Sequence, residues 1–267
     1  MFVRPRDYDR RAVRLQVAAL LVTVLTIASA ACSSAAVQPW DPQALAHGVV
    51  VRSLDAGKVA SLPTGPLYVR FIRFAQQVGY RIPSRQHQAG IIYVEVGVQR
   101  LTIAGQTPID IPAGRAKFHQ SVAHLHINPG PGPSVWYFIA LWPSTARSQQ
   151  VVDPIAHPVF ESGDIAPGVL PRGTYSMLLR RVDFDPHGAT EAHRFGGLSA
   201  FFVLEGSVTI KVDGRSPTAL ATGQGAAFDP GIGLQEVNEG ATGAVLLEFL
   251  TTPEGADFET PLRRPPG

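Results

Sequence analysis

The sequence is poor in features that mark several common classes of protein. It has one cysteine in 267 residues and therefore cannot form an internal disulfide. Its basic residues do not cluster with aromatic ones, which argues against nucleic acid as a partner. No serine stands in a Gly-X-Ser-X-Gly elbow and no glycine-rich loop precedes a helix, so the sequence indicates neither a serine triad nor a phosphate-binding loop.

The N-terminal segment has the pattern of an export signal. Its basic front consists of Arg4, Arg6, Arg10, Arg11 and Arg14. The run Leu15–Ala31 that follows is uncharged and mostly apolar, and it ends in small residues. Its 17 residues are fewer than the roughly 20 that a membrane-spanning helix needs. We therefore interpret residues 1–31 as a signal peptide and not as a membrane span.

The only cysteine, Cys32, directly follows this segment. The sequence Ala-Ser-Ala-Ala-Cys at 28–32 resembles the lipobox of bacterial lipoproteins, which implies cleavage before Cys32 and a diacylglycerol group on its sulfur. The alternative is ordinary cleavage after Ala30 or Ala31, which would leave a free thiol. We predict a lipoprotein signal peptide and a mature chain in the cell envelope, lipid-anchored to the outer face of the bacterial membrane or otherwise secreted.

The predicted leader carries the positive charge of the chain. The full sequence has 23 basic and 21 acidic residues and a formal net charge of +2. Residues 1–31 hold five of the arginines and two of the aspartates, so the remainder has 18 basic and 19 acidic residues and a net charge near −1. Without a basic excess, the mature chain has no electrostatic reason to bind nucleic acid or anionic lipid.

The rest of the chain favours short strands and turns. The full sequence has 26 glycines and 23 prolines, and apolar residues alternate with polar ones in stretches such as 207–212. Helical periodicity occurs only around 42–60, and it is weak. We expect Phe201, Phe202 and Phe228 in the core, with the first two on opposite faces of one strand. The pattern predicts an all-β chain.

Two parts of the chain share one plan. Gly97 and Asn128 are 31 residues apart, and Gly206 and Asn238 are 32 apart. A repeat of about 110 residues indicates duplication of a whole small domain. The predicted division is 1–31 signal peptide, 32–65 tether and lead-in, 66–145 first β-domain, 146–169 linker, 170–252 second β-domain and 253–267 C-terminal tail.

Both copies resemble cupin domains. The first motif of that family is similar to YVEVG (93–97) and FFVLEG (201–206), and the second to IPAGRAKFHQSVAHLHIN (111–128) and FDPGIGLQEVN (228–238). The resemblance implies a bicupin, with two antiparallel jelly-roll barrels in tandem. It implies no single activity, because cupins include oxygenases, isomerases, decarboxylases, seed storage proteins and sugar-sensing regulators.

The resemblance also implies where a metal would bind: a His-X-His pair, a following glutamate and one histidine of the second motif. These positions fall on Ser84, Gln86, Gly90 and His124 in the first copy and on His193, Phe195, Ser199 and Leu234 in the second. Each copy keeps one histidine, and a single imidazole does not hold a divalent ion tightly. We therefore expect neither barrel to have the usual metal centre of the family.

Other histidines of the first copy offer a different set of donors. His124 and His126 are two residues apart on an expected strand and would project from one face. His87 and His119 lie close by in the motif plan. His87, His124 and His126 are candidate ligands for a divalent metal such as Fe, Mn, Ni, Cu or Zn. The alternative, which we prefer, is that these imidazoles hydrogen-bond the backbone or line a polar barrel mouth that binds a ligand.

The second copy offers Glu191 and His193 on an extended segment. Gln235 or Glu236 could approach them from the second motif. Glu191 and His193 are candidate ligand-binding residues, and Glu191 would be a general base if burial raised its pKa. The alternative is that both side chains are solvated at a strand edge.

These observations favour an exported, lipid-anchored bicupin, degenerate at its metal sites, that binds a small molecule or an envelope component. Such a protein could be a monomer or a homodimer. The competing hypothesis is a metal-dependent cupin enzyme (a dioxygenase, isomerase or hydrolase) with a rearranged histidine site in the first copy; a third is a structural role. Three or more imidazole or carboxylate groups that converge on one point would favour the enzyme.

Overall fold

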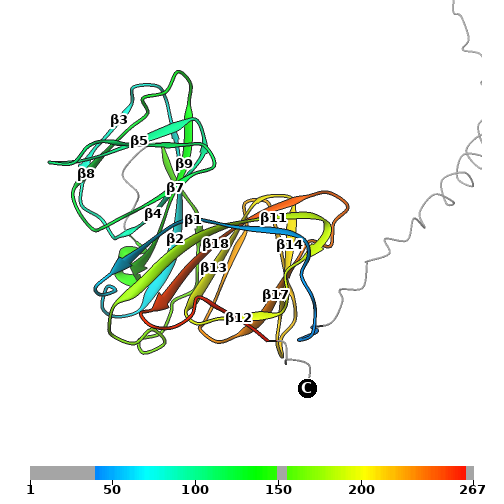
Figure 1. The fold of residues 1–267 in the computed structure, drawn as a ribbon. Coiled ribbons are helices and arrows are strands. Elements are labelled where there is room, and N and C mark those ends of the chain that lie inside the picture. The colour runs from blue at the N-terminus through cyan, green and yellow to red at the C-terminus, as the bar shows by residue number, and fades with distance from the viewer. Residues whose placement is uncertain (1–39, 149–154, 263–267) are drawn as a thin grey trace, which may run out of the picture. The chain divides into compact units, whose positions relative to one another are not determined.

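The computed structural model describes residues 40–148 and 155–262, which are almost entirely β-strand (Figure 1). The all-β prediction is confirmed. The predicted leader and Cys32 lie outside the described residues. Within the described part of the chain, no helix is long and apolar enough to cross a membrane.

The first barrel is built from two sheets and a short 3-10 helix, η1 (Ser144–Ala146). One sheet has five strands in the order β10-β2-β9-β4-β7, and the other has four in the order β3-β8-β5-β6. The strands are β2 (Leu67–Gln76), β3 (Arg81–Arg85), β4 (Gly90–Val96), β5 (Val98–Ile103), β6 (Ile109–Pro112), β7 (Ala116–His119), β8 (His124–Ile127), β9 (Ser134–Pro143) and β10 (Ala156–Glu161).

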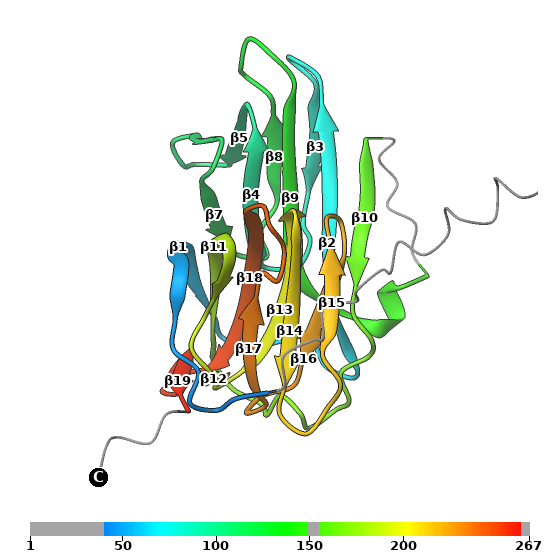
Figure 2. The ribbon, with the colours of Figure 1, turned by 90° about the vertical axis from the view of Figure 1, so that its right-hand side faces the viewer.

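The second barrel is one continuous sheet, and its strand order repeats the plan of the first (Figure 2). Its main path runs β15-β14-β17-β11-β18-β13-β16, with β1, β12 and β19 added beside it. The strands are β1 (His47–Val59), β11 (Tyr175–Ala189), β12 (His193–Phe195), β13 (Leu198–Glu205), β14 (Ser207–Val212), β15 (Thr218–Ala221), β16 (Gly225–Phe228), β17 (Gly233–Val237), β18 (Ala244–Pro253) and β19 (Glu259–Pro261).

The longest central strands are apolar on both faces because each face is buried in a different core. On β9, Trp136 and Phe138 pack inside the first barrel, whereas Tyr137 and Ile139 join a core between the two barrels. On β13, Phe201 lies in the core of the second barrel and Phe202 lies in the shared core, as the alternation predicted. Phe202 stacks on Phe71 of β2 with ring centroids 5.3 Å apart. This shared apolar layer joins the barrels.

The weak helical periodicity around 42–60 was misleading, because these residues form strand β1. β1 pairs with β11 from His47 opposite Ala189 to Val59 opposite Tyr175. Register shifts next to His47 and Ser53 break the alternation of the strand, and most of its side chains are exposed, so little periodicity of two remains. Strand β10 likewise comes from the segment 146–169 and pairs with β2.

The duplication is visible in one recurring turn. Asn128 donates from Nδ2 to the carbonyl oxygens of Gln76 and Gly132, and its Oδ1 accepts from the amide of Gly130. Asn238 makes the same three contacts, with Asp185, Thr242 and Gly240. Each buried asparagine thus fixes the loop that leads into the last long strand of its barrel.

Candidate metal centre

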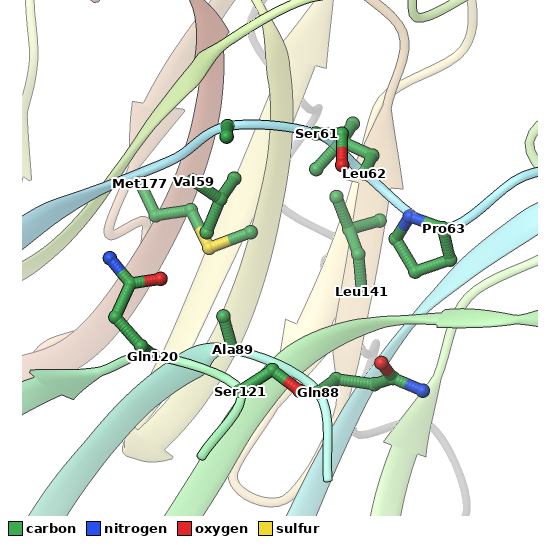
Figure 3. Close-up of a pocket in the computed structure, with 11 residues that line it drawn as sticks. Val59, Ser61, Leu62, Pro63, Gln88, Ala89, Gln120, Ser121, Leu141 and Met177 are labelled. Carbon is green, nitrogen blue, oxygen red and sulfur yellow. The ribbon is translucent and has the colours of Figure 1, made fainter.

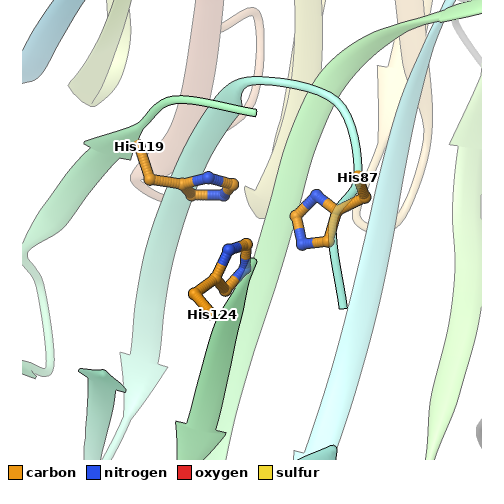
Figure 4. Close-up of side chains that lie close together, drawn as sticks. All are labelled: His87, His119 and His124. Atoms are coloured by element: carbon orange, nitrogen blue, oxygen red, sulfur yellow. The ribbon is translucent and has the colours of Figure 1, made fainter. Parts of the chain in front are cut away.

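Three histidines of the first barrel point at one another from three separate segments (Figure 4). His87 lies in the loop before β4, His119 ends β7 and His124 begins β8. One ring nitrogen from each lies within 4.8 Å of the others. Two of the ring pairs are closely packed, with centroids 4.5 Å apart for His87 and His124 and 4.4 Å apart for His119 and His124. A cation between them would therefore meet three imidazole donors.

Backbone carbonyls fix the protonation pattern of all three rings. The Nδ1 atoms of His87, His119 and His124 lie 3.0, 2.9 and 2.7 Å from the carbonyl oxygens of Gln88, Gln120 and Val122. A carbonyl can only accept, so each Nδ1 carries the hydrogen and each Nε2 keeps a lone pair. The Nε2 atoms of His119 and His124 are buried and have no hydrogen-bond partner. Metal-binding histidines are commonly oriented in this way.

The rings are held in the neutral form that binds metals. Burial, reinforced by His124, lowers the pKa of His87 to about 4. Burial is also the main cause that lowers the pKa of His119 to about 3, and it lowers the pKa of His124. Because neutral imidazole is the ligand form, no proton has to be displaced at neutral pH.

His126 lies next to this group but is not one of its three members. Its ring centroid is 4.7 Å from that of His124 and 6.4 Å from that of His87. It stacks on Trp136 at 4.7 Å, and its buried Nδ1 has no hydrogen-bond partner. Of the three predicted ligands, the structure thus brings His87 and His124 together and places His119, in place of His126, as the third.

The carboxylate that the family resemblance places at residue 90 has no room in this barrel. A Cβ atom at Gly90 would lie 2.4 Å from the carbonyl oxygen of Ile139 and 2.7 Å from the ring of Phe138. The Phe138 ring instead packs against His87, with centroids 4.3 Å apart, and stacks on His119 at 5.2 Å. His119, directly opposite Gly90 in the β4–β7 pair, supplies a nitrogen donor from the neighbouring strand.

A cavity of about 290 Å³ lies between the first barrel and strands β1 and β11, and none of the three histidines lines it (Figure 3). Its lining includes Gln88 and Gln120, whose carbonyls accept from His87 and His119, and has no charged side chain. The apolar part of the wall comes from Val59, Leu62, Leu141 and Met177. The cavity is thus suited to a small, uncharged molecule with a few polar groups.

The second barrel has a different set of side chains at the equivalent positions. Ser199 pairs with Phe228 as Gly90 pairs with His119, and Leu234 takes the place of His124. The Nδ1 atom of His193 lies 2.8 Å from the carbonyl oxygen of Glu191. The carboxylate next to its Nε2 is that of Glu236, at 3.5 Å. Within the described ranges, the three histidines of the first barrel are the group found with metal-binding geometry.

Comparisons with known proteins address the fold. No family model and no curated protein matches the chain. Among solved structures, it resembles the oxalate decarboxylase of Bacillus subtilis, described with Mn(II) centres, at 13% identity and a TM-score of 0.54 over 81% of each chain. It also resembles the 11S allergen of Cocos nucifera, at 12% identity and a TM-score of 0.53 over 79% of this chain and 91% of that one.

The chain has the bicupin fold. The predicted architecture of two tandem cupin-type barrels is confirmed. Because solved bicupins include both enzymes and storage globulins, the fold alone does not assign an activity.

Sequence reasoning missed the convergence for two local reasons. Counting back from Gly97 placed a ligand at Gln86, but the chain bends before β4, and Gln86 is exposed and donates to the carbonyl of Ser121. His87 takes the inward position instead. His119 is not one of the expected ligand positions of the family, and the sequence indicated only that it lies close by in the motif plan.

Proposed function

We propose that the first barrel of this bicupin binds one divalent transition metal through the Nε2 atoms of His87, His119 and His124. The carrying observation is the convergence of three buried or half-buried imidazoles whose Nδ1 atoms are all tied to backbone carbonyls. Three protein ligands leave at least one coordination position for water or substrate. This arrangement favours the metal-dependent hypothesis over the degenerate receptor.

The donor set favours some metals over others. Imidazole suits zinc, copper, nickel and iron, whereas manganese prefers more oxygen ligands. The exclusion of a carboxylate at Gly90 therefore supports zinc or copper in place of the Mn(II) described for the Bacillus subtilis oxalate decarboxylase. A metal held here would act as a Lewis acid or lower the pKa of a bound water. Separately, the uncharged cavity lined by Gln88 and Gln120 supports a small, uncharged ligand with a few polar groups between the first barrel and strands β1 and β11.

Metal content tests this proposal, and the second barrel supplies the matched variants. His119→Phe and His124→Leu install the residues that the second copy has at the same register, Phe228 and Leu234, so the fold should tolerate them. We expect one metal per chain in the purified protein, and about a hundredfold weaker zinc binding in either variant. Isothermal titration and elemental analysis measure both. Unchanged zinc affinity in both variants would overturn the proposal.

The envelope location is a separate part of the proposal. We propose that the chain is exported and anchored through diacylglycerol on Cys32, on the support of the lipobox-like sequence and the leader before it. We expect Cys32→Ser to move the protein from the membrane fraction to the soluble fraction of the envelope, because the lipid would be lost. Mass spectrometry of the N-terminal peptide should show the lipid in the chain that keeps Cys32. A membrane-bound Cys32→Ser protein would contradict the anchor.

A further inference from the structure

Charged side chains occupy positions in the interior of the second barrel where the first has Ile72 and Phe138. Arg180 of β11 and Glu248 of β18 lie directly opposite each other. Each stands two residues after an apolar residue of the barrel core, Leu178 or Leu246. Residues two apart on a strand share a face, so both side chains point inward. Glu248 is 2% exposed and takes the position that Phe138 has in the first barrel. Such a group of buried ionisable residues requires electrostatic partners.

The strands at the mouth of this barrel add three further ionisable residues. Glu236 of β17 is fully buried and accepts from the hydroxyl of Thr190 at 2.5 Å. His193 of β12 is 3% exposed, with its Nε2 3.5 Å from Glu236 and its Nδ1 3.9 Å from Glu259. The Nε2 atom of His193, Oε1 of Glu236 and Oε2 of Glu248 are buried and lack hydrogen-bond partners. The interior is therefore polar and incompletely satisfied.

One member of the network comes from the C-terminal end of the described chain. Glu259 lies on β19, a strand of three residues that pairs with β12 at the mouth of the barrel (Figure 2). Its carboxylate forms an ion pair with Arg180, which also lies 3.6 Å from Glu248. Arg180 is only 13% exposed, and β19 has no other strand partner than β12 within the described chain. A short terminal strand thus places a carboxylate on a buried guanidinium.

The carboxylate of Glu259 affects the protonation of the other groups in the network. Burial on its own would lower the pKa of His193, but Glu236 and Glu259 outweigh it and raise this pKa to about 10. Burial and the nearby Glu236 raise the pKa of Glu248 to about 8. Without the carboxylate of Glu259, the carboxylate that remains next to Arg180 among the described residues is that of Glu248, at 3.6 Å.

We propose that Arg180 and His193 form a binding site for a small carboxylate in the second barrel, which Glu259 occupies as an internal substitute. The ligand class is a monocarboxylate with a short chain, because the group it replaces is the end of a glutamate side chain. A guanidinium that is mostly withdrawn from water binds a carboxylate far better than a solvated one. The inference is independent of the metal proposed for the first barrel.

Chemical rescue tests this site. Glu259→Ala removes the equivalent of one acetate ion and should lower the melting temperature, because it leaves Arg180 buried without its carboxylate. We expect acetate to raise that temperature saturably, and more than chloride at the same ionic strength. Acetamide, which has the same shape without the charge, should have no effect. The unmodified chain should bind acetate at least tenfold more weakly, because Glu259 competes for the site.

Variants of Arg180 provide the control. In a chain that carries both Glu259→Ala and Arg180→Met, acetate should no longer stabilise the protein. If that chain does not fold, Arg180→Lys keeps the charge but loses the planar fork, and rescue should weaken at least tenfold. Acetate binding can be read independently from the line width of ¹³C-labelled acetate. Stabilisation by acetate no greater than by chloride, or equal rescue with and without Arg180, would overturn the proposal.

Discussion

Acidification should destabilise the metal-free protein through the histidine cluster, and His119→Phe should reduce this sensitivity. His87 and His119 have folded-state pKa values of about 4 and about 3, whereas a histidine in the unfolded chain titrates near 6.5. Between these values the unfolded state binds more protons, so the free energy of unfolding falls as the pH falls. This stability is fully present above pH 6.5 and is lost towards pH 3. Each residue contributes up to about 1.4 kcal/mol per pH unit.

The measurement compares denaturant unfolding of the original chain and His119→Phe from pH 6.5 to 4 with a chelator present. From His119 alone we expect the difference in unfolding free energy to change by about 3 kcal/mol in favour of the variant. The raised pKa of Glu248 acts in the opposite direction over this range, and that of His193 does so mainly above pH 6.5, since their folded states bind more protons. They contribute equally to both chains and cancel. A constant difference over this range would show that His119 is protonated in the folded protein.

The fold could be predicted because it depends on patterns that the sequence displays directly. The spacing between Gly97 and Asn128 recurs between Gly206 and Asn238, and each asparagine fixes the same turn. The two-sided burial of β9 and β13 follows from their continuous apolar runs. Strand β1 could not be predicted, because an exposed edge strand with shifted register has little alternation.

The histidine site was only partly predictable, because its residues come together only in the folded chain. A motif fixes which positions are expected to hold ligands, but His119 is not one of them although it lies within the second motif, and the irregular segment 86–89 before β4 places His87, and not Gln86, in the site. In the second barrel the sequence predicted His193 as a candidate ligand-binding residue, and its side chain is buried. Its neighbour Glu259 lies 66 residues after it, and Arg180, which pairs with Glu259, lies 13 residues before it, so no local pattern joins them.

The two barrels have side chains of different chemistry at equivalent inward positions. The inward position on the last long strand is Phe138 in the first barrel and Glu248 in the second, and the position on the strand of the second motif is His126 in one and Glu236 in the other. The first interior is thus uncharged and rich in nitrogen lone pairs, and the second has ion pairs. This divergence supports the proposals of a metal site in one barrel and a carboxylate site in the other.

Gly90→Ala should cost about 3 kcal/mol or more in the free energy of unfolding, measured by chemical denaturation. Its Cβ would lie 2.4 Å from the carbonyl oxygen of Ile139, which belongs to the β4–β9 ladder, and 2.9 Å from the Cβ of Ala140. Backbone on the central strand cannot yield without breaking this ladder. Gly90→Glu restores the glutamate that the family resemblance implies. We expect it to lower the free energy of unfolding further than Gly90→Ala does and not to make the site bind manganese.

Gly132→Ala is the matched control for this prediction. A Cβ at Gly132 would meet nothing within 4 Å, so we expect a change of no more than about 0.5 kcal/mol. If Gly90→Ala is also tolerated, the wall formed by Phe138 and β9 is able to shift, and a carboxylate could then join the three histidines. That result would remove the argument for zinc or copper over manganese, because the choice of metal depends on a site that admits nitrogen donors and excludes oxygen.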